Sequence, residues 1–307
     1  MRKVLLIAST PYTGSTLLSI LLGSHPEIAT ISELTGLNPD IDETSYMCSC
    51  GSRLVECQFF DQVSRRVGEL GADFSYSDFN TRFHTGGNRI VRNILYRSLF
   101  VNVLERVRGF FVSFSQKYRS NIDYWSHQNA VYIDAISEIR DSKLFLDASK
   151  DRCRIEYLSK LNNTELSIVH LVRDPRGYVN SARKNSGKSL FRASIEWRLQ
   201  HREIERLISM AGAKCIRVKY EDICVAAKVE LDRISNFCGI AEFNEIGFKP
   251  NELHLIGNRM RLKKDLSIKI DESWKSELSE TRVRLIEFLC GSVMVKKYGY
   301  HASAQSE

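Results

Sequence analysis

The stretch from Val4 to Leu18 constrains the fold more than any other part of the chain. Its apolar run, Val4 to Ala8, predicts a buried strand of a parallel sheet, which is followed by a tight loop and an apolar helix that begins near Thr13. Such a loop sets the free N–H groups and the positive dipole end of the helix against an anion. The segment therefore predicts an α/β fold with a phosphate-binding loop after its first strand.

The loop departs from the pattern of nucleoside triphosphatases, G-x-x-x-x-G-K-[ST]. Gly14 and Thr16 match this pattern, whereas Ser9 stands at the first glycine position and Ser15 at the lysine position. That lysine contacts the β- and γ-phosphates of a triphosphate. We therefore expect a loop that holds phosphate but is poorly equipped to cleave a triphosphate, which counts against a P-loop nucleotide kinase.

Apolar runs of strand length recur along the chain, with helical patterns between them. This alternation predicts a P-loop-like, three-layer α/β fold with a mostly five-stranded parallel sheet. Ligands of such sheets bind at the carboxyl ends of the strands. We expect the further strands at Ile28–Ser32, Lys143–Asp147, Ser167–Val172 and Cys215–Tyr220, and a helix at Ser194–Ala211.

Residues 42–140 interrupt the alternation, so we expect a single domain over 1–307 with a helical insertion packed over one end of the sheet. The insertion contains a long amphipathic segment from Ile90 to Phe114. Interleaved arginines favour a solvated helix face over a binding role. These arginines are Arg89, Arg92, Arg97, Arg106 and Arg108.

Composition leaves the class of protein broad. Lys and Arg exceed Asp and Glu by 7, which suits an anionic ligand or a membrane surface without deciding between them. The sequence has no run of about 18 apolar residues, so we expect no transmembrane helix. Its 8 cysteines in 307 residues are too sparse for a secreted disulfide scaffold, which favours a reducing cytoplasm.

A second anion-binding turn is predicted after the strand Ser167–Val172. Pro175 suits the first turn of a helix that Asp174 caps, so Arg173 comes at the carboxyl end of the strand. A guanidinium there can clamp a phosphate, and Ser181, about two turns into the helix, can add a hydroxyl. Alone, this pattern also fits a generic turn with a surface arginine. Its pairing with the first loop at one sheet edge favours phosphate binding.

Both turns resemble the phosphate-binding motifs of sulfotransferases that use 3′-phosphoadenosine 5′-phosphosulfate (PAPS), particularly the bacterial and carbohydrate-type members. Ser9–Leu18 resembles their 5′-phosphosulfate loop, and Leu171–Arg183 resembles their 3′-phosphate motif. The resemblance covers nearly the whole chain apart from the helical insertion. It extends to His25–Glu33, Asp147–Lys150, Val218–Ile223, His254–Arg261, Asp271–Trp274 and Tyr298–Tyr300.

The resemblance implies transfer of a sulfuryl group from PAPS to a hydroxyl or amine by in-line displacement, with no metal required. It assigns Thr13, Gly14, Ser15 and Thr16 to the 5′ end of the nucleotide. Arg173 and Ser181 are assigned to the 3′-phosphate, with Asn258 and Arg261 in a loop near the nucleotide. Tyr12 stands where the family carries a Lys or Arg that faces the leaving group. Its hydroxyl can donate a hydrogen bond there, or its ring can pack.

Lys150 is our candidate for the missing cation, because it follows the strand Lys143–Asp147 at the same sheet edge; the alternative is a surface lysine. Glu33 is the first candidate for the general base and His254 the second, with an ordinary loop histidine as the alternative. Asp147 is the third candidate, or else a helix cap or ion-pair partner. Trp197 either faces the adenine or lies in the core.

The segment Cys48–Cys57 holds three thiols within ten residues. A closed zinc site has four ligands, and the segment suggests no fourth, since the nearest downstream histidine is His84. We therefore expect a structural turn with free or paired thiols, with a zinc site as the alternative. The other five cysteines are expected to be small core residues.

The acceptor is expected to be a small molecule, a lipid or a carbohydrate, bound beneath the helical insertion. We expect no nucleic-acid partner, and the sequence leaves the oligomeric state open. Because Tyr12 replaces the usual cation, a non-catalytic nucleotide-binding relative stays as the alternative to an enzyme.

Overall fold

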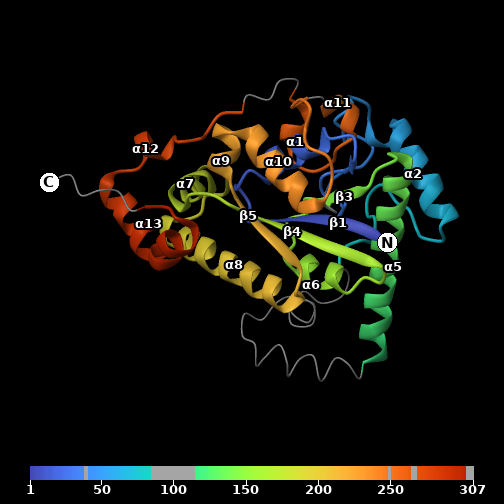
Figure 1. Cartoon of the computed structure of the whole chain (residues 1–307), viewed down its shortest axis with the longest axis horizontal. Helices are drawn as coiled ribbons and strands as arrows, with labels where there is room; N and C mark the ends of the chain where they lie inside the picture. Colours follow the sequence, from blue (N-terminus) through green and yellow to red (C-terminus); the bar gives the residue numbers. More distant parts are fainter. Residues whose placement is uncertain (38–40, 84–114, 248–249, 264–267, 302–307) are drawn as a thin grey trace.

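Five parallel strands form one sheet in the order β2-β3-β1-β4-β5. Figure 1 labels four of them, β3, β1, β4 and β5. The computed structural model describes residues 1–37, 41–83, 115–247, 250–263 and 268–301. The sheet confirms the predicted α/β class and all five expected strands. They are β1 (Arg2–Ala8), β2 (Ile28–Ala29), β3 (Leu144–Asp147), β4 (Thr164–Val172) and β5 (Lys214–Lys219).

The two central strands, β1 and β4, carry the turns that the sequence predicts to bind phosphate. They pair in register from Arg2 with Thr164 to Ala8 with His170. Both strands are covered on both faces, which is why they are apolar runs rather than alternating patterns. The adjacent carboxyl ends bring the residues that follow β1 and β4 to the same edge of the sheet.

Helices cover both faces of the sheet and so complete the expected three layers (Figure 1). The apolar side chains of one face, including Leu5 and Ile7, pack against one set of helices, and those of the other face, including Val4 and Leu6, pack against a second set. The first set is α1 (Ser15–Gly23), α9 (Tyr220–Val225) and α10 (Ala227–Cys238). The second set is α2 (Gln58–Glu69), α5 (Gln116–Ile139), α6 (Cys153–Ser159) and the last turns of α8 (Leu190–Ala211).

A third apolar cluster lies beyond the end of β4 and centres on the fully buried Trp197. It is built from α7 (Pro175–Ser186), the first turns of α8 and α13 (Glu280–Ser292). Short elements complete the described chain. They are η1 (Leu54–Glu56), α11 (Pro250–Leu253), η2 (Arg259–Leu262), α12 (Trp274–Glu277) and η3 (Val293–Lys297).

Strand β2 is shorter than the predicted Ile28–Ser32. The hydroxyl of Thr30 donates to the carbonyl of Leu146, 2.8 Å away, and accepts from the backbone N–H of Ser32 at 2.9 Å. Ser32 then takes a positive φ of 71°, which a regular strand does not allow. Side-chain hydrogen bonds to the backbone therefore turn the chain out of the sheet after Ala29.

The predicted insertion, residues 42–140, is described at its two ends, 42–83 and 115–140. Helices α2 and α5 pack together and bury Phe60, Val63, Tyr132 and Ile136 in the core on one face of the sheet. The predicted amphipathic segment from Ile90 to Phe114, with its arginines and His84, lies outside the described residues.

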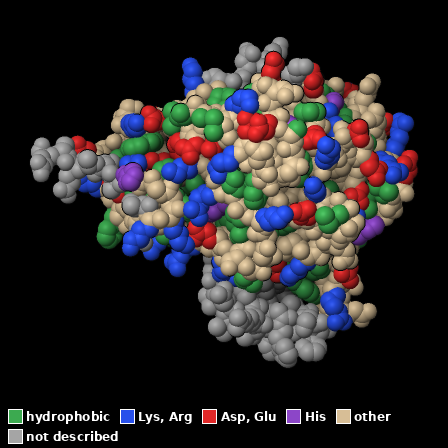
Figure 2. All heavy atoms as spheres, viewed as in Figure 1, with side chains coloured by type: hydrophobic (Ala, Val, Ile, Leu, Met, Phe, Trp, Pro, Cys, Tyr) green, Lys and Arg blue, Asp and Glu red, His purple; other side chains and the backbone are tan. Residues whose placement is uncertain are grey.

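Acidic and basic side chains lie next to one another over most of the face drawn in Figure 2. Ion pairs at the surface are common among the described residues, for example Lys228 with Asp232 at 2.6 Å. Among the described helices, none is both long enough and apolar enough to cross a bilayer.

Candidate functional site

A cavity of about 620 Å³ opens at the carboxyl ends of β1 and β4. This is the edge where the sequence predicts two phosphate-binding turns, and residues from both turns line it. The predicted residues among its lining are Tyr12, Gly14, Ser15, Thr16, Lys150, Arg173, Ser181 and Asn258. The sequence assigns no site role to four of the other lining residues. These are Lys263 and Lys269, and also Tyr220 and Asp271, which lie in segments that carry the resemblance.

Gly14 gives the first turn its shape. It lies directly before α1 with a φ of 90°, a left-handed value that favours glycine. A Cβ at this position would lie 2.5 Å from Cδ2 of Tyr220, so the ring also leaves no room for a side chain. The first residues of α1, Ser15 and Thr16, consequently face the cavity with the unpaired N–H groups of the helix start.

Thr13 has a structural place in this loop. Its side chain is fully buried, and its Oγ1 lies 2.6 Å from Oγ1 of Thr10 within the loop itself. Thr13 is not among the described residues that line the cavity. Its predicted contact with the nucleotide therefore rests on its backbone.

Arg173 joins the two turns. Its Nη1 donates to the carbonyl of Tyr12 at 2.8 Å and to Oγ of Ser181 at 3.3 Å. Its Nη2 donates to Oδ2 of Asp271 at 2.8 Å, and its guanidinium lies 4.6 Å from the ring centre of Tyr220. This one guanidinium thus contacts the loop after β1, the helix after β4 and the segment around Asp271.

The local structure after β4 is the predicted one. Asp174 caps α7 by accepting from the N–H of Arg176 at 2.8 Å, and Pro175 occupies the first turn. Trp197 donates its Nε1–H to the carbonyl of Arg173 at 3.2 Å from within the core. Of the two roles considered for Trp197, the structure shows the core role, and the indole holds the backbone of Arg173 in place.

Electrostatics in the cavity favour an anion. Burial by itself would raise the pKa of Asp271, but hydrogen bonds from Arg173 and Ser273 outweigh it and lower this pKa to about 2. Burial raises the pKa of Tyr220 to about 12, so its hydroxyl stays protonated near neutral pH. Among the described lining residues, four cationic side chains outnumber one carboxylate, Asp271. The cationic residues are Lys150, Arg173, Lys263 and Lys269.

Lys150 and Glu33 form an ion pair beside the cavity. Nζ of Lys150 lies 2.7 Å from Oε1 of Glu33, and both side chains are partly exposed. Gly257 packs against this carboxylate, because a Cβ at its position would lie 2.7 Å from Cδ of Glu33. The carboxyl-end edge of the sheet therefore holds two of the three predicted catalytic residues side by side.

Asp147 and Arg261 have structural contacts. Asp147 is fully buried and pairs with the equally buried Arg154, which is the ion-pair role left open for it. Arg261 is buried as well, where it donates to the carbonyl of Met47 at 2.7 Å and lies 4.3 Å from the ring centre of Tyr46. It fastens the loop that presents Asn258 to the cavity, but it is not among the described residues of the lining.

His254 lies in different surroundings from Glu33 and Lys150. Its Nδ1 is 3.2 Å from Sγ of Cys57 and 3.9 Å from Sγ of Cys48. Like Arg261, it is absent from the described lining of the cavity. No sequence pattern predicts that His254 contacts these cysteines, since 197 residues separate His254 from Cys57.

The sequence model of one protein family, described as "Sulfotransferase family", matches residues 5–245. This chain belongs to the sulfotransferase family. The matched part of the sulfotransferase includes both turns, Lys150 and Glu33, and ends before His254, Asn258 and Asp271.

No curated protein matches this sulfotransferase. Among solved structures, it is similar to the sulfotransferase domain of the olefin synthase from Synechococcus PCC 7002, with a TM-score of 0.48, 20% identity and 94% of each chain covered. The sulfotransferase domain from the curacin biosynthetic pathway has a TM-score of 0.48, 15% identity and 99% of each chain covered. A sulfotransferase from Alicyclobacillus acidocaldarius has a TM-score of 0.36 and 11% identity, and the match covers 94% of this chain and 96% of that one.

Proposed function

We propose that this sulfotransferase transfers a sulfuryl group from PAPS to a hydroxyl or amine acceptor by in-line displacement. Family membership supports sulfuryl transfer in general. The observation that carries the choice of donor is the contact of Arg173 with both turns, at the carbonyl of Tyr12 and the hydroxyl of Ser181. A cavity with an anion-binding turn on each side suits a nucleotide that carries anionic groups at both ends.

The two ends of the donor would take different parts of the cavity. The N–H groups at the start of α1 and the hydroxyls of Ser15 and Thr16 would hold the 5′-phosphosulfate. Arg173 and Ser181 would hold the 3′-phosphate, since a guanidinium fork matches phosphate oxygens. Lys263 and Lys269 add positive charge to the same cavity.

Lys150 and Glu33 would perform the chemistry. Glu33 would accept the proton of the acceptor as its oxygen or nitrogen forms the new bond to sulfur. The bond from sulfur to the bridging oxygen breaks, and Lys150 would stabilise the negative charge that grows on that oxygen. The products are the sulfated acceptor and adenosine 3′,5′-bisphosphate. Because the two side chains form an ion pair, each would position the other before the donor binds.

Tyr12 favours a second candidate function, a non-catalytic nucleotide-binding relative. The residue brings no positive charge to the position where the family carries one. Its ring centre lies 6.3 Å from that of Tyr178, and it packs against the apolar cluster around Trp197. Only a transfer measurement separates this candidate from an enzyme.

The acceptor and the cellular setting are proposed from the sequence. The acceptor would be a small molecule, a lipid or a carbohydrate, and the insertion would cover it. We place the protein in the cytoplasm, with no nucleic-acid partner and with PAPS chemistry that needs no metal at the reacting centre.

Binding and transfer measurements test the proposal together. Calorimetry should detect adenosine 3′,5′-bisphosphate binding, and labelled PAPS with a mixed acceptor library should yield labelled product. Binding without transfer to any acceptor would support the non-catalytic relative. A failure of both adenosine 3′,5′-bisphosphate and PAPS to bind would exclude both candidate functions.

Variants of the ion pair test the catalytic assignment. Lys150→Met and Glu33→Gln should each lower kcat by about 10²- to 10³-fold, because each removes charge stabilisation or proton transfer from the transition state. Lys143→Met is the matched control, since Lys143 pairs with Glu27 outside the cavity. A kcat within twofold of the wild-type value for either cavity variant would remove that residue from the mechanism.

A further inference from the structure

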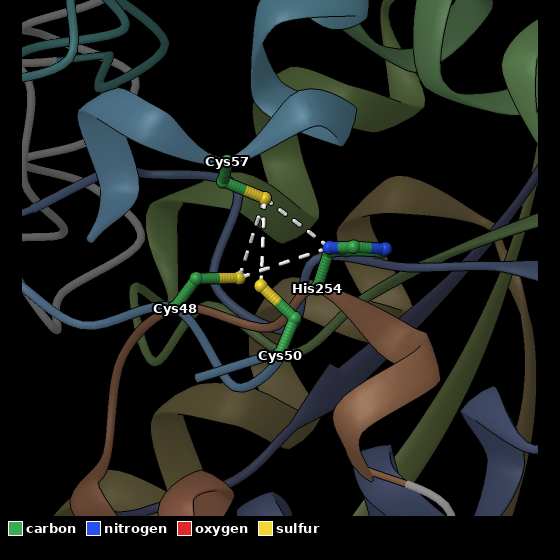
Figure 3. Close-up of side chains that lie close together, drawn as sticks. All are labelled: Cys48, Cys50, Cys57 and His254. Atoms are coloured by element: carbon green, nitrogen blue, oxygen red, sulfur yellow. Dashed lines mark hydrogen bonds between the residues drawn. The ribbon is translucent and has the colours of Figure 1, made fainter. Parts of the chain in front are cut away.

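Three cysteines and one histidine converge at a place that the proposed reaction does not use. The side chains of Cys48, Cys50, Cys57 and His254 point toward one another (Figure 3). Their three Sγ atoms and the Nδ1 atom of His254 all lie within 4.8 Å of one another. The histidine is the fourth ligand that the spacing of the cysteines alone does not suggest.

The distances fit a tetrahedron around one ion. Sγ of Cys57 lies 3.7 Å from Sγ of Cys50 and 3.8 Å from Sγ of Cys48. Zinc–sulfur bonds of 2.3 Å at tetrahedral angles require about 3.8 Å between sulfur atoms and about 3.6 Å between sulfur and nitrogen. Nδ1 of His254 lies 3.2 Å from Sγ of Cys57 and 3.9 Å from Sγ of Cys48. These two distances lie on either side of the sulfur–nitrogen distance of about 3.6 Å that a zinc site requires.

The first two cysteines are presented by a tight turn. The N–H of Cys48 donates to the carbonyl of Ser52 at 2.9 Å, and the N–H of Gly51 donates back to Cys48 at 3.1 Å. Gly51 supplies the positive φ of 92° that this turn needs. Cys57 enters from the start of α2, so all three thiols belong to the described first part of the insertion.

His254 is held with its Nδ1 toward the thiols. Two hydrogen bonds join the next residue, Leu255, to Ser49. The N–H of Leu255 donates to Oγ of Ser49 at 2.6 Å, and the carbonyl of Leu255 accepts from the N–H of Ser49 at 3.2 Å. The imidazole stacks on the ring of Phe59 with 4.8 Å between centres and 11° between planes. His254 takes a φ of 53°, an uncommon value for a residue with a side chain. Packing and backbone contacts thus hold the ring against rotation away from the cluster.

We propose that Cys48, Cys50, Cys57 and His254 form a structural zinc site. Four protein ligands of sulfur and nitrogen are the usual set for Zn²⁺ in a closed site, which leaves no open position for catalysis. Binding releases the protons of the three thiols, so no oxidant or reductant is involved. The buried guanidinium of Arg261 donates to the carbonyl of Met47, next to Cys48, and sets a positive charge near the three thiolates.

The proposal revises two expectations from the sequence. Zinc replaces the expected free or paired thiols of Cys48, Cys50 and Cys57. With its Nδ1 on the metal, His254 becomes a ligand rather than a general base. The site would join the insertion to the chain segment that continues through Asn258, and it holds whether or not PAPS is the donor.

Metal analysis of the full-length protein, purified without chelators, provides the first test. We expect about one zinc ion per chain, removal of it by a strong chelator and a lower melting temperature afterwards. Cys50→Ser and His254→Ala should lose the bound zinc. Cys215→Ser is the matched control and should keep it, because Cys215 is an exposed thiol on β5.

Cobalt substitution provides a readout on the wild-type protein, independent of whether the variants fold. Co²⁺ in place of zinc should give the strong visible absorption of four-coordinate cobalt with a sulfur charge-transfer band. Absence of zinc after growth in zinc-supplemented medium, together with absence of these bands, would overturn the proposal. A disulfide between Cys50 and Cys57 in the freshly purified folded protein, found by mass spectrometry, would also overturn it.

Discussion

Arg173 shows how much one residue of the cavity depends on partners that sequence patterns do not reveal. Its position after β4 follows from the strand pattern and from Pro175, so the sequence predicts it well. Its ion pair with Asp271 does not follow, because 98 residues separate the two in the chain. A strand pattern predicts which edge a residue reaches, whereas the loop that meets it there depends on packing that has no periodic signal.

The ion pair of Arg173 with Asp271 leads to a prediction of opposite effects. Arg173→Ala should weaken PAPS binding by about 10- to 100-fold, the usual worth of a charged hydrogen bond, and should affect adenosine 5′-phosphosulfate far less. Asp271→Asn should tighten PAPS binding, by up to about fivefold, because a carboxylate no longer competes with phosphate for the guanidinium. Calorimetry with both ligands measures these changes.

The two ligands serve as controls for each other, since only PAPS has a 3′-phosphate. Equal losses for both in Arg173→Ala would show that this residue does not read the 3′-phosphate. Weaker PAPS binding in Asp271→Asn would mean that the carboxylate positions Arg173 rather than competing for it.

Among the elements, the buried ones are the ones that the sequence predicts. Strands β1, β3, β4 and β5 match their apolar runs to within a few residues, because burial on both faces demands such runs. Helix α7 was predictable from Asp174 and Pro175, which start it by capping and by a fixed φ. The early end of β2 was not, since it depends on the hydroxyl of Thr30 reaching a carbonyl of β3.

The turn before α1 gives a prediction at this scale. Gly14→Ala must adopt a φ of 90° and displace the ring of Tyr220, whereas Gly187→Ala, the control at a φ of 62°, meets no atom within 4 Å. Gly14→Ala should therefore lower the free energy of unfolding by at least about 1 kcal/mol more than the control, and weaken nucleotide binding as well. Denaturant titration and calorimetry measure the two effects. Equal losses of unfolding free energy in the two variants would show that the ring of Tyr220 moves aside without measurable destabilisation.

At the scale of the whole molecule, two histidines connect the sheet to the helices that cover it. His170 on β4 and His201 on α8 are both buried, with Nε2 of the first 3.0 Å from Nδ1 of the second. Burial lowers the pKa of His170 to about 3 and the pKa of His201 well below its usual value. Both rings are therefore neutral in the folded protein at neutral and mildly acidic pH.

This pair predicts a loss of stability in mild acid. Below pH 6.5 the unfolded chain binds protons at these histidines and the folded chain does not, so the free energy of unfolding falls as the pH falls. The expected loss between pH 7.5 and 5.5 is about 1.4 kcal/mol for each histidine. Denaturant titrations at the two pH values measure it.

Variants separate this pair from the other groups that titrate. His170→Gln should reduce the loss between pH 7.5 and 5.5, whereas His127→Gln, at an exposed histidine, should leave it unchanged. An unchanged pH dependence in His170→Gln would show that the pair does not control acid stability.

The cavity at the carboxyl ends of β1 and β4 also has a consequence for folding. Its lining extends from Pro11 to Asp271, so its walls come from nearly the full length of the chain. Contacts of such long sequence separation close late and slowly, and a fragment must reach at least from Pro11 to Asp271 to contain all the described lining residues. A ligand of this cavity therefore binds only the completely folded chain, and each molecule bound draws the population toward the native state by mass action.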